Sequence, residues 1–152
     1  MSNYTYTVMP PSTMLCPTPV VLVSCADPKQ PDDRNMITLA WAGTVNSEPP
    51  MVSISVRKER YSHHLIADSG EFVVNLVDEK MCEAVDFCGV RSGRDVDKFA
   101  ECRLTAEEAT EIDCATVAES PVSIECRVTE IVPLGSHDMF VADIVADRTS
   151  VV

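Results

Sequence analysis

The chain has 152 residues, of which 45% are hydrophobic, and its 24 acidic and 12 basic side chains give a formal net charge of −12. This length and composition are typical of a single globular domain, here spanning residues 1–152. The acidic balance argues against nucleic acid and anionic membrane surfaces as partners, because basic patches supply the affinity for both.

The N-terminal residues 1–14 lack the basic region and the apolar core of a secretion signal, and the apolar run at 19–23 is far too short to span a bilayer. We therefore expect a cytoplasmic protein. The seven cysteines are scattered, without a C-x-x-C pair or a histidine at zinc-ligand spacing. We expect reduced, partly buried thiols and no metal site; a metal site is the alternative.

The first half of the chain predicts three strands. Residues 20–26 are typical of a strand buried on both faces, and a polar turn over 27–34 follows. Residues 35–46 are expected to form a second strand with one bulky face and one face of small side chains. Residues 51–57 alternate apolar and polar side chains, which indicates a third strand.

Near Ser62 the hydrophobic period changes to that of a helix, which we expect to be capped by Ser62 and ended by Gly70. The later predicted elements are a strand over 71–77, a helix over 78–89 ended by Gly89, a charged loop over 90–101, a helical turn over 105–109 from the capping-box pair Thr105 and Glu108, and two long strands over 120–134 and 137–152 joined by a hairpin. Many strands joined by short turns predict a mainly β protein, a closed or half-closed barrel with short helices.

A basic cluster stands at the predicted junction between the third strand and the first helix. Arg57, Lys58 and Arg60 end the strand, and Ser62 offers a hydroxyl at the helix N-terminus. Helix N-termini bind phosphates through free N–H groups, and guanidinium groups strengthen such a site. The cluster therefore predicts a phosphate cradle; the alternative is a solvated basic turn with an ordinary serine cap.

The second strand carries only small side chains on one face, at Thr38, Ala40 and Ala42. A flat aromatic ligand can lie against a backbone only where side chains are small. With a phosphate at the neighbouring cradle, this face suits a nucleotide-type cofactor; packing against another sheet or a subunit is the alternative. Neither a dinucleotide-binding glycine motif nor a P-loop is present. For His137, in the predicted hairpin, two interpretations stay open: an exposed turn histidine without a role, or a residue that reaches a site at the barrel rim.

These segments together resemble the flavin reductase-like, FMN-binding split-barrel family, and within it the flavoredoxin branch. The resemblance is carried by four stretches in the same order, "TPVVLVSC", "NMITLAWAGTVNSEPPMVSISVRKERYSHHLIADSGEFVVNL", "DFCGVRSGRDVDKFAE" and "SPVSIECRVTEIVPLGSHDMFVADIV". It implies a Greek-key split barrel that forms a homodimer and binds FMN, rather than FAD, near the dimer interface.

The resemblance also implies the site residues, position by position. The flavin ring and ribityl chain would lie against Asn35, Thr38, Ala40 and Trp41, with the ring edge at Thr44, Val45 and Asn46. The phosphate would be held by Ser55, Arg57, Lys58 and Ser62. Lys98 and Phe99 match a loop near the flavin. His137 matches a turn near the reactive ring and the nicotinamide, and is the catalytic candidate.

The resemblance implies an oxidoreductase that passes electrons from NAD(P)H through bound flavin to an acceptor. The alternative is a flavin-bound electron carrier without NAD(P)H activity, whose acidic surface docks a basic redox partner protein. A binding protein that has lost flavin is a third hypothesis, against which the retained cradle argues. Two departures from the family pattern are Ala142–Asp143, where relatives carry Gly-Glu or Gly-Arg, and the end at Val152, where relatives continue. We therefore expect altered nicotinamide recognition and weaker or more exposed FMN.

Overall fold

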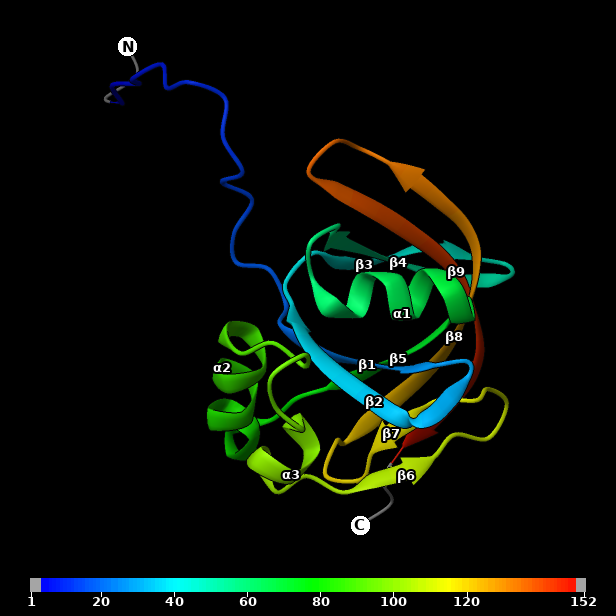
Figure 1. The fold of residues 1–152 in the computed structure, drawn as a ribbon. Helices are drawn as coiled ribbons and strands as arrows, with labels where there is room; N and C mark the ends of the chain where they lie inside the picture. The colour runs from blue at the N-terminus through cyan, green and yellow to red at the C-terminus, as the bar shows by residue number, and fades with distance from the viewer. Residues whose placement is uncertain (1–3, 150–152) are drawn as a thin grey trace.

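The computed structural model describes residues 4–149 and is mainly β. Seven strands form one antiparallel sheet in the order β2-β1-β5-β8-β9-β4-β3. Their bounds are β1 Val21–Asp27, β2 Gln30–Leu39, β3 Ala42–Ser47, β4 Pro50–Arg57, β5 Glu71–Leu76, β8 Val122–Pro133 and β9 His137–Thr149. Residues 4–20 precede the sheet as an extended segment that reaches away from the body (Figure 1).

The sheet curls so that its two edges approach each other without pairing. Helix α1 (Tyr61–Ser69) lies across this opening and contacts β1, β2, β4 and β5 (Figure 1). The edge strands β2 and β3 follow one another in the chain, and the connection between them crosses from one edge to the other. Within residues 4–149 the result is a split barrel, in agreement with the expected half-closed, Greek-key architecture.

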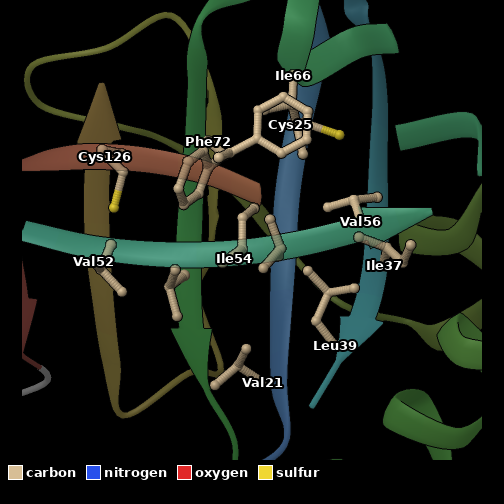
Figure 2. Close-up of a cluster of buried hydrophobic side chains, with 14 of the residues drawn as sticks. Val21, Cys25, Ile37, Leu39, Val52, Ile54, Val56, Ile66, Phe72 and Cys126 are labelled. Atoms are coloured by element: carbon tan, nitrogen blue, oxygen red, sulfur yellow. The ribbon is translucent and has the colours of Figure 1, made fainter. Parts of the chain in front are cut away.

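The main core fills the inside of the curled sheet. Alternate residues of each strand point to the same face, so β4 contributes Val52, Ile54 and Val56 to the interior. Figure 2 shows these side chains converging with Phe72 of β5 and Ile66 of α1. Complete burial of such a side chain stabilises the fold by about 1.5 to 3 kcal/mol, and this packing holds α1 in the opening of the barrel.

A second layer covers the outer face of β1 and β2. It consists of the short helix η1 (Glu79–Met81), α2 (Cys82–Val90), α3 (Lys98–Cys102) and the two-stranded sheet of β6 (Ala106–Glu108) and β7 (Ala115–Val117). None of the helices in residues 4–149 has the length and apolar character needed to cross a membrane.

The prediction of one strand over 35–46 was wrong. The backbone bends at Ala40–Trp41, so the stretch belongs to β2 and β3 at opposite edges of the sheet. The Trp41 carbonyl accepts a hydrogen bond of 2.9 Å from the Ser55 N–H of β4, which fixes the bend. The polar turn predicted over 27–34 is also shorter, because β2 already begins at Gln30.

Three further predictions from local sequence patterns were wrong in the type or the extent of the element. The predicted turn of helix over 105–109 contains strand β6 instead, because the backbone of Ala106–Glu108 pairs with β7. Gly89 lies inside α2, which continues to Val90. The predicted loop over 90–101 ends in α3, whose N-cap Asp97 accepts a bond of 3.2 Å from the Ala100 N–H.

Other boundaries were confirmed. Helix α1 ends at Gly70, which adopts a left-handed conformation with φ of 70° and donates its N–H to the Ile66 carbonyl. The two long strands β8 and β9 form the expected hairpin, with its turn between Pro133 and His137. The part of the second strand predicted over residues 150–152 lies outside the described residues.

The core also contains a carboxylate that the sequence pattern does not predict. Glu125 on β8 is fully buried, and its two oxygens accept bonds of 2.8 Å from the backbone N–H groups of Thr110 and Glu111. These bonds hold the loop between β6 and β7 against the sheet. Buried backbone donors without hydrogen-bond partners destabilise a fold. The Glu125 carboxylate gives two N–H groups of this loop their partners and so stabilises the fold.

Replacement of Glu125 by Gln is expected to lower the free energy of unfolding by about 1.5 to 3 kcal/mol, because one charge-assisted bond is lost and an amide donor then faces an N–H donor. Urea denaturation measures the change. Glu130→Gln, at an exposed position of the same strand, is the matched control and should be neutral. Equal midpoints for the two variants would contradict the role assigned to Glu125.

Candidate functional site

A groove runs from the loop that follows α2 to the bend at Ala40–Trp41. It consists of two hollows of about 360 Å³ and 180 Å³, whose walls share Ile37, Arg57 and Arg60. We call the part near the α2 loop the cationic end, and the part near the bend the strand end. The groove thus joins the two features, a basic cluster and a face of small side chains, that the sequence analysis treated separately.

The cationic end gathers basic side chains from two segments that are distant in sequence, residues 57–60 and 91–98. Five of the chain's 12 basic residues line it, and Glu59 is the single acidic residue in the described walls. The five are Arg57, Arg60, Arg91, Arg94 and Lys98. In a chain with a net charge of −12, this concentration makes the cationic end suited to an anion such as a phosphate.

Lys98, the first residue of α3, is a buried cation with neutral partners. Its side chain is 3% exposed, and Nζ donates bonds of 2.6 Å to the Met36 carbonyl and 2.9 Å to the Cys88 carbonyl. Within residues 4–149 it forms no ion pair with a carboxylate. Burial lowers its pKa because the charge lacks solvent, so an anion in the groove would stabilise the protonated form.

Asn35 and Ser62 form a buried polar pair in the wall of the groove. The Asn35 amide donates a bond of 2.7 Å to the Ser62 hydroxyl, whereas Asn35 Oδ1 accepts no bond within the described residues. Gly93 lies against this amide, since a Cβ built on it would be 2.2 Å from Asn35 Oδ1. A ligand hydroxyl in the groove would satisfy the open acceptor.

The predicted helix cap at Ser62 was wrong. Arg60 is the N-cap residue of α1, without a side-chain cap bond, and Ser62 lies one residue inside the helix, fully buried. Its hydroxyl is turned to Asn35 because that amide is its buried partner. Ser62 nonetheless lines the cationic end, where the sequence analysis expected it.

The strand end places small side chains opposite an aromatic pair. Thr38, Ala40, Trp41 and Ser55 line it together with His137, the first residue of β9. The Trp41 and His137 rings lie 4.5 Å apart at an angle of 37°. The wall at Ala40 has no bulky side chain, so a flat ring has room to approach the backbone there.

His137 is held directly opposite Arg57 by the pairing of β9 with β4. Burial lowers the pKa of the imidazole, and the guanidinium of Arg57 lowers it further. The ring is therefore neutral at pH 7, with one nitrogen as a donor and one as an acceptor. Ser136 Oγ lies 2.9 Å from Nδ1.

Five of the predicted site residues do not line the groove. Thr44, Val45 and Asn46 lie exposed on β3, in the hairpin with β4, because the bend at Ala40–Trp41 carries β3 to the far edge of the sheet. Lys58 forms an ion pair with Asp138, and Phe99 packs in the second layer against Leu22 and Met36 of β1 and β2.

Sequence reasoning missed the residues that the α2 loop contributes. Arg91, Gly93 and Arg94 line the cationic end, and Arg94 lies over the Tyr61 ring at 5.4 Å from its centroid. The sequence does contain a pattern that could have indicated an anion site in this loop: two arginines and a glycine within four residues are unusual in so acidic a chain. What the sequence did not provide was the distance between this loop and Arg57.

Behind the groove, Asp138 anchors the helix that carries Ser62. Its carboxylate lies 2.8 Å from His63 Nε2 and 3.2 Å from Lys58 Nζ. Burial alone would raise the pKa of Asp138, but the His63 hydrogen bond and the Lys58 ammonium outweigh it and hold the pKa below the ordinary value of 3.8. The carboxylate is thus charged in the folded protein at neutral pH.

Because the folded-state pKa is depressed, ionised Asp138 stabilises the fold above pH 3.8, and this contribution is lost as the pH falls through the lower folded-state pKa. Asp138→Asn is therefore expected to lower Tm at pH 7, with a difference from wild type that shrinks toward pH 3. Thermal melts across this range test it. Asp86→Asn, at an exposed site on α2, should show no such pH-dependent gap.

Comparison with known proteins gives consistent matches. The family model described as "Flavin reductase like domain" matches residues 13–150. The flavoredoxin structure of Desulfovibrio vulgaris (Miyazaki F) is 28% identical, with a TM-score of 0.87 over 96% of this chain and 77% of that one. For the flavoredoxin of Methanosarcina acetivorans the identity is 28% and the TM-score 0.88, over 97% of this chain and 76% of that one.

A curated relative from Streptomyces pristinaespiralis, described as an NADH:riboflavin 5'-phosphate oxidoreductase, is 25% identical over 131 residues, 86% of this chain and 70% of that protein. The chain spans between 40% and 66% of the length of four other curated relatives that it matches.

Proposed function

Since this chain belongs to the flavin reductase-like domain family, in its flavoredoxin branch, we propose that it binds FMN in the groove and is an oxidoreductase that passes electrons from NAD(P)H through the flavin to an acceptor. The observation that carries the proposal is the groove itself. Five cations line the cationic end, and the strand end combines the small side chains of Thr38, Ala40 and Ser55 with the rings of Trp41 and His137. This distribution suits a phosphate joined to a flat ring.

The residues present fit FMN. Arg57, Arg60, Ser62 and Lys98 would hold the phosphate. The buried Lys98 ammonium, bonded only to neutral carbonyls within the described residues, would gain a countercharge. Asn35 Oδ1, a buried acceptor without a partner in residues 4–149, would accept a bond from a ribityl hydroxyl. The wall at Ala40 would leave room for the ring.

Bound FMN would supply the capacity to accept a hydride and to release the electrons to an acceptor. The chain's own residues bind and orient the reactants. Trp41 and His137 form an aromatic wall at the strand end on which a nicotinamide would stack. His137 is neutral at pH 7 and so offers hydrogen bonds without repelling a cationic ring.

The position of Ala142 and Asp143 bears on the choice of electron donor. Ala142 is fully buried in the main core, and Asp143 pairs with Met51 on β4; neither lines the groove. This departure from the family pattern therefore lies outside both hollows of the groove and does not by itself argue against NAD(P)H as the electron donor.

We also propose a homodimer whose interface lies beside the strand end. Trp41 in the bend and Val45 on β3 are 44% and 50% exposed. A second copy placed there would bury these apolar side chains and bring the β3 edge, with Thr44 and Asn46, toward a flavin ring.

The test is an FMN titration of the purified chain by flavin fluorescence, followed by NADH and NADPH oxidation with an added electron acceptor. We expect saturable binding and flavin-dependent oxidation of a reduced nicotinamide. Binding without oxidation of either nucleotide would favour the electron carrier. A folded protein that does not bind FMN would overturn the proposal.

A further inference from the structure

Two cysteines on neighbouring helices bring their sulfur atoms together beside the groove. Cys88 on α2 and Cys102 on α3 have their Sγ atoms 3.9 Å apart, although the residues are 14 positions apart in the chain. Helices α2 and α3 contact each other. A disulfide requires about 2.05 Å between the sulfurs, so the two sulfur atoms would have to approach by about a further 1.9 Å from this contact distance. Both thiols are free in the structure.

The segment between these two cysteines forms one wall of the cationic end. It carries Arg91, Arg94 and Lys98, and Cys88 itself lines the groove. The Cys88 carbonyl also accepts a hydrogen bond from Lys98 Nζ. A covalent link between the two cysteines would therefore close a loop that contains three of the five cations in the groove.

We propose that Cys88 and Cys102 form a reversible disulfide that restrains this wall and strengthens ligand binding in the groove. The effect on FMN rests on the proposed function; formation of the disulfide does not. A cross-linked segment has fewer conformations to lose when it closes on a phosphate, so the oxidised protein binds FMN more tightly than the reduced protein.

The reaction balances with a low-molecular-weight disulfide such as oxidised glutathione. The Cys102 thiolate, on the half-buried residue of the pair, attacks one glutathione sulfur, which forms a mixed disulfide and releases one glutathione thiolate. The Cys88 thiolate then displaces the second glutathione from Cys102. Two protein thiols lose two electrons and two protons, and one glutathione disulfide becomes two glutathione thiols.

Burial raises the pKa of Cys88 to about 12 and also raises the pKa of Cys102. The thiolate is therefore scarce at neutral pH, so exchange is slow and accelerates as the pH rises.

The first experiment maps the disulfide without FMN. The full chain is equilibrated with mixtures of reduced and oxidised glutathione, quenched with acid, alkylated and digested. We expect a peptide pair linked through Cys88 and Cys102 whose fraction follows the glutathione ratio. Cys102→Ser should abolish it, whereas Cys82→Ser, at an exposed cysteine of α2, should retain it. Stable glutathione adducts or links to other cysteines in its place would overturn the proposal.

The second experiment compares oxidised and reduced protein. Oxidation of the wild type is expected to raise Tm and to tighten FMN binding several-fold, and Cys102→Ser should show neither change. A disulfide without these changes would overturn its role in the groove. If the reduced protein does not bind FMN, the proposed function and the effect on FMN fail together, while the disulfide map still decides whether the pair is redox-active.

Discussion

Replacement of both Arg57 and Arg60 by Gln is expected to weaken FMN binding by about 100-fold, while the protein keeps its fold. Both side chains line the two hollows of the groove, and both are largely exposed, so their loss costs little stability. A hydrogen bond to a charged group contributes about 1.5 to 3 kcal/mol, and the lower value for each arginine gives two factors of about ten. Flavin fluorescence titration measures the change.

The matched control is Lys29→Gln combined with Lys80→Gln, which removes the same charge at two exposed positions outside the groove. This control should bind FMN nearly as well as the wild type. In the wild type the affinity should fall with added salt, and this dependence should be weaker in the arginine variant. Equal losses in both variants would mean that net charge, and not the groove, governs binding.

Replacement of Gly93 by Ala is expected to weaken FMN binding by about tenfold or more and to lower Tm. A Cβ at this position would lie 2.2 Å from Asn35 Oδ1 and 2.6 Å from Asn35 Cγ, distances that require the loop or the buried amide to move. Overpacking of this kind costs about 1 to 3 kcal/mol. Either movement separates the α2 loop from the Asn35–Ser62 pair, and so distorts the cationic end.

Gly89→Ala is the control, because it adds the same methyl group four residues earlier. Its Cβ would lie 3.5 Å from Thr38 Cβ, which is ordinary van der Waals contact. Since Gly89 is inside α2, alanine should stabilise the helix by up to about 1 kcal/mol. If Gly93→Ala and Gly89→Ala changed the FMN affinity and Tm by the same amounts, the close packing at Gly93 would be refuted.

The resemblance to a family of FMN-binding split barrels anticipated the fold, and most of the residues that it implied for the site line one groove in the structure. Asn35, Thr38, Ala40 and Trp41 line its walls, as do the residues at the end of β4. Lys58 is not among the residues that line the groove, and its ammonium group pairs with Asp138 instead. A resemblance transfers positions along the chain, whereas side-chain direction follows from the partners available in this fold.

By itself, the sequence determined the local elements with strong periodicity or a definite end signal. The alternation of β4, the glycine that ends α1 and the β8–β9 hairpin depend on neighbouring residues, and all were correctly predicted. The tertiary structure decided the bend at Ala40–Trp41, the strand at β6 and the meeting of Arg91, Arg94 and Lys98 with Arg57. Each of these depends on pairing or packing between distant segments, whose energy no local pattern of side chains encodes.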